Sequence, residues 1–350
     1  MKRKYALDFL RIPATVIIVM HHFQQDFEAR FPGYINFCGG NFSFGYLVEF
    51  FFVLSGFLML PAVKRIYSGE VGFGTFMFRK MRRLLPMTAL CALAYDAVDI
   101  TAWIQSGFSQ PLRASLVMTV ADILGIQGGW CFRDTVVNIP SWYVCVLLLC
   151  CVLLFLLVRL CKKIKCRIEY GLIAVILLGC GAFSFEFNLP FLNYASSRGY
   201  YAFFFGVLLA LGMEKYSFHK PKYYILSGIV LLFSLFDILR GRGDGFLIAF
   251  FISPALILLF TSPAAERIFR SKIWQTLGNI QFHVYLWQAV IIDLVYVLGK
   301  VGLSMNALYS IKGMCAFVLF MELFGAASYF LLEKRADRLF TALLPEKKEI

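Results

Sequence analysis

The chain has 350 residues, of which 60% are hydrophobic, and it carries a formal net charge of +13. Its mean hydropathy is +0.74. This apolar share is too high for a soluble globular protein, so that class is excluded. Apolar runs of about 18 residues or more recur along the chain, and each is long enough to cross a hydrocarbon layer of roughly 30 Å. The runs do not alternate between apolar and polar residues, which excludes a transmembrane β-barrel.

These runs predict an all-α polytopic membrane protein with about ten transmembrane helices. The expected helices cover about residues 7–24, 44–63, 84–104, 140–158, 170–189, 199–213, 223–239, 245–261, 276–298 and 313–332. We expect residues 1–344 to form one membrane domain and residues 345–350 to form a charged cytoplasmic tail.

The distribution of basic residues predicts the orientation of the helices. With the N-terminus in the cytoplasm, cytoplasmic segments hold 26 of the 34 Lys and Arg residues and the other side holds 8. This is a positive-inside pattern with both termini cytoplasmic. The basic excess is therefore explained by topology among membrane lipids, and it implies no nucleic acid partner.

The first expected helix carries two polar residues on one face. Arg11 and His22 are eleven residues apart, which is almost three turns, so they lie roughly 16 Å apart along the same stripe. Glu49 supplies a carboxylate near the start of the next helix. Placing a cation and an imidazole within an apolar membrane helix costs free energy, so these residues suggest a functional site. The alternative for His22 is a helix-end histidine among lipid headgroups.

Four basic residues, Arg79, Lys80, Arg82 and Arg83, precede the third expected helix, with Pro86 in its first turn. One explanation of this cluster is the usual excess of basic residues on the cytoplasmic side. The alternative is that the cluster binds phosphates, such as those of a coenzyme A thioester. Arg198 opens the sixth helix on the outer side, where it either snorkels to the headgroups or belongs to a site.

Other polar and small residues have structural explanations of their own. Ser55 and Gly56 favour close helix packing, and Trp142 and Tyr143 suit an aromatic belt. The ninth helix contains Gln281, His283, Gln288 and Asp293, so it faces protein or a wet cavity. A run from 116 to 126 is too short to span and is expected to be interfacial or re-entrant.

The ten cysteines lack metal-binding spacing, and the histidines are scattered, so no metal site is expected. Cys38 and Cys131 are the two cysteines on expected external loops, and a disulfide between them is left open.

Taken together, these stretches resemble the acyltransferase-3 family of membrane-bound acyltransferases, which modify carbohydrates and similar acceptors. In chain order the matching motifs are LDFLR with His22-Phe23, EFFFVLSGF, RRLLP, SWYVCVLLL, RGYYAFFFG and LGNIQFHVYLW. The form resembled is a stand-alone one of Gram-positive bacteria, without an appended SGNH-type esterase domain. Gln288 departs from the family, since many members have a histidine there.

The resemblance implies roles for individual residues. His22 is implied as the catalytic base or acyl carrier, Arg11 supports donor handling, and Glu49 falls where members often have an acid. We expect Glu49 to orient the His22 ring and to stabilise its charged form. Arg83 matches a family arginine, and Lys80 stands where members more often have an arginine. The residues expected to bind donor or substrate are Arg79, Lys80, Arg82, Arg83, Arg198, Trp142 and Ser55.

The expected function is transfer of a short acyl group, most simply acetyl, to a hydroxyl of an extracytoplasmic or lipid-linked glycan. Acetyl-CoA or another acyl-CoA serves as co-substrate, no cofactor stays bound, and the chain lies in a bacterial plasma membrane. The alternative is a polytopic transporter that moves an acyl group or a lipid-linked sugar without making a bond.

Overall fold

The computed structural model of this protein describes residues 4–30, 44–109, 115–130, 138–216, 218, 220–300, 308 and 310–343, which are mostly helical and contain no strand. The helices are α1 (Tyr5–Arg30), η2 (Phe44–Leu47), α2 (Val48–Phe57), α3 (Leu60–Ser68), α4 (Phe73–Gln105), α5 (Leu116–Leu124), α6 (Ser141–Lys163), α7 (Ile168–Ser184), α8 (Tyr194–Lys215), α9 (Pro221–Leu239), α10 (Gly245–Leu247), η3 (Ile248–Ile252), α11 (Ser253–Phe260), α12 (Pro263–Ile268), α13 (Ile273–Lys300), α14 (Ile311–Ser328), η5 (Tyr329–Glu333) and α15 (Lys334–Leu343). Cys38, Cys131 and the expected tail 345–350 lie outside the described residues.

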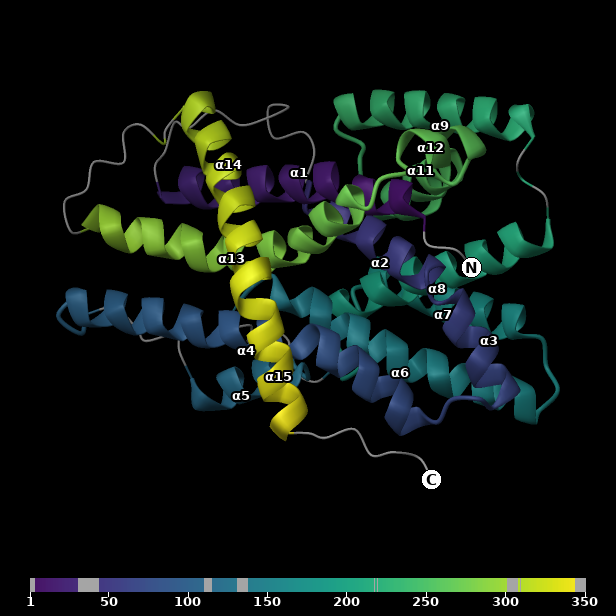
Figure 1. Ribbon diagram of the computed structural model, residues 1–350, viewed down its shortest axis with the longest axis horizontal. Coiled ribbons are helices and arrows are strands. Elements are labelled where there is room, and N and C mark those ends of the chain that lie inside the picture. Colours follow the sequence, from purple (N-terminus) through teal and green to yellow (C-terminus); the bar gives the residue numbers. More distant parts are fainter. Residues whose placement is uncertain are drawn as a thin grey trace.

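The long helices form a bundle in which elements distant in sequence are neighbours. Helix α13 packs against α1 on one side and α4 on the other, and α2 packs against α8. Figure 1 shows α1, α13 and α4 running side by side, with α14 and α15 crossing over them. The N-terminal helix α1 and the late helix α14 thus both pack against α13.

The described helices make this a multi-pass membrane protein. Six of them are long and apolar enough to cross a membrane, and α2 with α3 adds a seventh if the pair, bent by 42°, is one span. Every segment expected to span lies largely on helix. However, α7 and the run from α10 to α11 are short for a span, and α8 is not among the candidates. The expected count of ten is therefore not confirmed.

Helices α2 and α8 approach each other at two glycines. A Cβ added to Gly56 would fall on the carbonyl oxygen of Phe203, and one added to Gly206 would fall on that of Val53. Each helix therefore packs its backbone against the other, as small residues allow between membrane helices. The packing role predicted for Gly56 is confirmed.

Helix α4 begins earlier than the sequence suggests. Its first residue is Phe73, so Pro86 lies inside the helix and not in its first turn. A proline removes one backbone hydrogen bond, and the long flanking turns continue the helix on both sides of it. The segment 79–83 is consequently helical, which decides where its basic side chains point.

The expected short segment forms α5, which packs against α4. Asp122, near its end, is buried and accepts hydrogen bonds from the side chain of Gln127 and, at 3.2 Å, from the backbone N–H of Asn138. Burial raises the pKa of Asp122 to about 6. The Asn138 side chain donates to the carbonyl of Leu286, which connects this cluster to α13.

Candidate functional site

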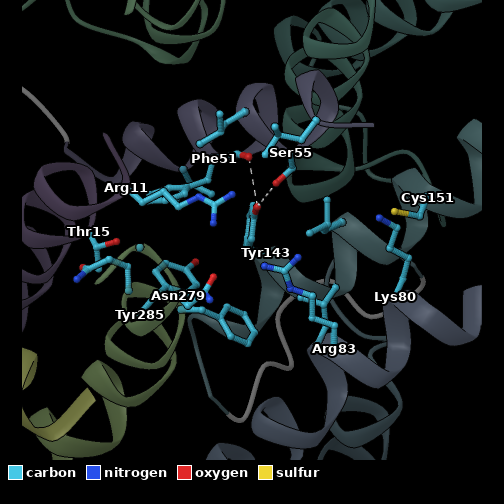
Figure 2. Close-up of a pocket in the computed structure, with 18 of the residues that line it drawn as sticks. Arg11, Thr15, Phe51, Ser55, Lys80, Arg83, Tyr143, Cys151, Asn279 and Tyr285 are labelled. Atoms are coloured by element: carbon cyan, nitrogen blue, oxygen red, sulfur yellow. Dashed lines mark hydrogen bonds between the residues drawn. The ribbon is translucent and has the colours of Figure 1, made fainter. Parts of the chain in front are cut away.

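A cavity of about 480 Å³ lies between α1, α2, α4, α6 and α13, with one residue from η5. We call it the central cavity. Three cationic side chains line it, Arg11 from α1 and Lys80 and Arg83 from α4. Figure 2 shows Arg11 on one side of the cavity and Lys80 and Arg83 on the other, with Tyr143 between them. The volume is within the usual range for ligand pockets, roughly 300–1,000 Å³.

Helical geometry explains why two of the four basic residues of the 79–83 segment line the central cavity. Residues three apart share a face of a helix, so Lys80 and Arg83 point the same way. Arg79 and Arg82 form the other such pair, and neither lines the cavity. The expected four-residue clamp is thus divided between two faces of α4.

The cavity cations have neighbours that fix their positions. Nη1 of Arg11 lies 3.3 Å from the carboxylate of Asp8, one turn earlier on α1. Nζ of Lys80 donates to the sulfur of Met59 at 3.2 Å and lies over the ring of Phe76. A thioether is a weak acceptor, so Lys80 keeps much of its capacity to bind an anion.

Four side chains with hydroxyl groups also line the central cavity, namely Thr15, Ser55, Tyr143 and Tyr285. The hydroxyl of Tyr143 lies 3.0 Å from Oγ of Ser55, and it donates to the carbonyl of Phe51 at 3.3 Å (Figure 2). Ser55 therefore lines the cavity, whereas its neighbour Gly56 packs against α8. The sequence assigned Tyr143 to an aromatic belt, and its place at this cavity was missed.

Glu49 is fully buried and forms a bidentate ion pair with Arg198. Nε of Arg198 donates to Oε1 at 2.5 Å, and Nη2 donates to Oε2 at 2.7 Å. The hydroxyl of Tyr201 donates to Oε1 at 2.8 Å, and Nη2 of Arg198 also donates to the carbonyl of Gly45 at 3.1 Å. These bonds compensate both charges for loss of water.

Aromatic rings enclose the guanidinium of Arg198. It lies over the rings of Tyr46, Trp142 and Tyr194, at 5.3, 4.8 and 5.4 Å from their centroids. Such cation–π contacts stabilise a desolvated arginine. We call Glu49, Arg198, Tyr201 and Trp142 the Glu49–Arg198 cluster. Arg198 is buried, so it does not snorkel to the headgroups.

The cluster and the central cavity are separate but adjacent. Glu49 and Ser55 lie on the same helix, α2, about 9 Å apart by helical rise. Phe52 fills the space between them, since its ring packs against Tyr143 on the cavity side and Trp142 on the cluster side. Trp142 and Arg198 therefore contact each other and do not line the cavity.

His22 lies on α1, three turns beyond Arg11, as its spacing predicted. Its side chain is half-buried, its ring lies 5.3 Å from that of His21, and it does not line the central cavity. The carboxylate of Glu49, expected to orient His22, is bonded to Arg198 and Tyr201 instead. An ion pair across 149 residues of sequence leaves no local pattern that could have predicted it.

Helix α13 supplies polar groups that face protein, as its composition predicted. Gln281 donates to a carboxylate oxygen of Glu322 at 2.8 Å, and Nδ1 of His283 lies 2.9 Å from Oγ of Ser328. Gln288, fully buried, donates to the carbonyl of Tyr285 at 3.0 Å. Gln288 thus has a structural role in its own helix.

The comparisons with known proteins give one match. A family model described as an acyltransferase domain matches residues 4–325, nearly the whole chain. No curated protein matches the chain, and no solved structure does.

Proposed function

The chain belongs to the acyltransferase-3 family, and on this premise we propose that it is a membrane-embedded O-acyltransferase. The acyl group, most simply acetyl, comes from a cytoplasmic acyl-CoA. The acceptor is a hydroxyl of an extracytoplasmic or lipid-linked glycan, and the membrane is a bacterial plasma membrane. The transporter alternative gains no support from the family match.

The observation that supports a coenzyme A donor is the central cavity. Arg11, Lys80 and Arg83 give it three cations, and the phosphates of coenzyme A are strongly anionic. Arginine binds phosphate through two parallel hydrogen bonds, and lysine binds it as a point charge. Ser55 and Tyr143 add hydroxyl groups for the polar arm of the donor.

In the proposed reaction His22 acts as the base. A nitrogen of its ring takes the proton of the acceptor hydroxyl, and the acceptor oxygen forms a bond to the thioester carbon. The carbon–sulfur bond then breaks, and the coenzyme A thiolate leaves and takes up a proton. Arg11 stabilises donor phosphate or developing oxyanion charge in this scheme. The donor's flexible arm covers part of the roughly 16 Å between Arg11 and His22.

The Glu49–Arg198 cluster has a positioning role in this proposal. Glu49 holds the guanidinium of Arg198 in one orientation, and Trp142 covers its face. A fixed, desolvated cation near the acyl path favours the anionic transition state more than a mobile one, because it needs no reorganisation. This replaces the expected direct pairing of Glu49 with His22.

The test compares two adjacent histidines, His22→Ala and His21→Ala. Each variant is purified in nanodiscs and given radiolabelled acetyl-CoA, and release of free thiol and labelled ester on envelope glycan are measured. We expect His22→Ala to lower the rate by about 10²–10⁴-fold, the usual contribution of a general base. His21→Ala should retain most activity. Full activity in His22→Ala would exclude this mechanism, and absence of thiol release by the unmodified protein would exclude acyl transfer from coenzyme A.

A further inference from the structure

The central cavity has a second chemical character besides its cations. Helix α13 and η5 contribute acceptor groups to its lining, namely Asn279, Gln281 and Glu333. The cations come from other elements, α1 and α4. A cavity that combines cations with acceptors fits a ligand that combines anionic groups with N–H or O–H donors.

The two amides carry unused acceptors. Oδ1 of Asn279 and Oε1 of Gln281 are both buried, and neither has a hydrogen-bond partner among the described residues. Gln281 cannot easily turn away, because its Nε2 donates to Glu322. A buried acceptor without a partner is costly, but neither oxygen is exposed to the cavity, so Glu333 is the acceptor in the lining that a ligand reaches directly.

Glu333 reaches the cavity through an unusual backbone conformation. It ends η5, a π-helical segment that separates α14 from α15. Such segments occur frequently at functional sites, because they redirect side chains that a regular helix would place elsewhere. Glu333 lies beyond residue 325, where the family match ends, so the match does not account for it.

His283 points its free nitrogen at Glu333. The indole N–H of Trp287 donates to Oγ of Ser328 at 2.9 Å, and the same hydroxyl lies 2.9 Å from Nδ1 of His283. The hydroxyl keeps its own hydrogen available for Nδ1, and in that tautomer the ring hydrogen is on Nε2, on the side of Glu333.

Nε2 is buried without a hydrogen-bond partner among the described residues, and lies 3.8 Å from Oε2 of Glu333. That distance is too long for a hydrogen bond, and it places the ring beside the carboxylate, where it limits the orientations that the carboxylate can take. The carboxylate thus keeps its capacity to accept hydrogen bonds from a ligand.

We propose that Glu333, oriented by His283, determines the ligand specificity of the central cavity by accepting hydrogen bonds from N–H or O–H groups of a phosphorylated ligand. The phosphates of that ligand lie at Arg11, Lys80 and Arg83. The identification of this ligand with coenzyme A rests on the proposed function. Its amide and hydroxyl groups donate the hydrogen bonds that Glu333 accepts.

The experiment uses two probes, coenzyme A and pyrophosphate, titrated calorimetrically into the full chain in nanodiscs. Coenzyme A has phosphates together with amide and hydroxyl donors, whereas pyrophosphate has the anionic part alone. We expect Glu333→Gln to weaken coenzyme A binding at least ten-fold and to leave pyrophosphate binding unchanged. Lys80→Gln should weaken both probes. His283→Phe should weaken coenzyme A alone, with no further effect in the Glu333→Gln background.

Glu214→Gln is the matched control, since its side chain is 47% exposed and that of Glu333 is 43% exposed. It should bind both probes like the unmodified protein. Retained pyrophosphate binding shows that a Glu333 variant is folded. Glu333→Asp is a second variant, which keeps the carboxylate on a side chain shorter by one methylene group.

Three results would overturn the proposal. If Glu333→Gln binds coenzyme A as well as the unmodified protein, the specificity role fails while acyl transfer stands. If it loses both probes equally, Glu333 is structural. If the unmodified protein binds pyrophosphate but not coenzyme A, the donor in the proposed function is wrong and this inference fails with it.

Discussion

At the scale of single residues, the buried Glu49–Arg198 ion pair depends most closely on the identity of its two side chains. Both side chains are buried, and each charge depends on the other for compensation. Removing one partner of such a pair leaves an uncompensated charge in a low-dielectric interior. The enclosing rings and the two parallel bonds also require a planar guanidinium, which lysine does not offer.

We therefore predict that Glu49→Gln and Arg198→Lys each destabilise the protein by about 3–5 kcal/mol. The double variant should lose less stability than the sum of the losses in the two single variants, because both changes disrupt the same interaction. Thermal unfolding of the four proteins in detergent measures this coupling, with Arg242→Lys, at an exposed arginine, as the control. Additive losses, or an Arg198→Lys variant as stable as the unmodified protein, would contradict the prediction.

At the scale of elements, α2 carries groups from both polar sites and depends on α8 for its position. Glu49 is in the first turn of α2, and Ser55 is near its end at the central cavity. Gly56 and Gly206 let the two backbones touch, so the distance between the helices sets where both groups lie. Side chains at these glycines would move the cluster and the cavity together.

We predict that Gly56→Ala or Gly206→Ala lowers the free energy of unfolding by about 1–3 kcal/mol, the usual range for overpacking. Gly212→Ala, on the same helix as Gly206, is the matched control, because an added Cβ there meets nothing within 4 Å. Thermal unfolding and the folded fraction after size-exclusion chromatography are the measurements. Equal behaviour of Gly206→Ala and Gly212→Ala would refute the close contact.

The same elements show which features of the fold follow from local sequence and which depend on long-range packing. Apolar runs predicted the long helices, and the Arg11 to His22 spacing predicted their shared helix, because both depend on local chain geometry. The helices α12 and α15 and the start of α4 were not predicted. The partner of Glu49 and the division of the basic cluster around Arg83 were not predictable. They depend on long-range packing and on a helix start at Phe73 that no cap residue marks.

At the scale of the whole molecule, charged contacts join segments that the charge distribution predicts to share one side of the membrane. Lys64 pairs with Glu214, and Lys4 pairs with Glu266 at 2.9 Å. The ammonium of Lys162 also donates to the carbonyl of Ser68 at 3.3 Å. All three contacts connect segments expected in the cytoplasm, so the helix packing agrees with an alternating arrangement of these segments.

The orientation itself stays a prediction, and impermeant thiol labelling tests it. Glu70→Cys adds a thiol between α3 and α4, and Arg242→Cys adds one between α9 and α10, both at exposed positions. In intact cells we expect a membrane-impermeant maleimide to label Arg242→Cys, and to label Glu70→Cys only after permeabilisation. The unmodified protein, with ten cysteines of its own, gives the background.

The orientation matters because two of the three cavity cations, Lys80 and Arg83, lie toward the Glu70 end of α4. Lys80 and Arg83 are about two and three turns from Phe73, the first residue of that helix. If labelling follows the predicted pattern, these cations lie near the cytoplasmic surface, where a cytoplasmic acyl-CoA can reach them. The opposite pattern would place them near the outer surface, where a cytoplasmic donor could not reach them without crossing the membrane.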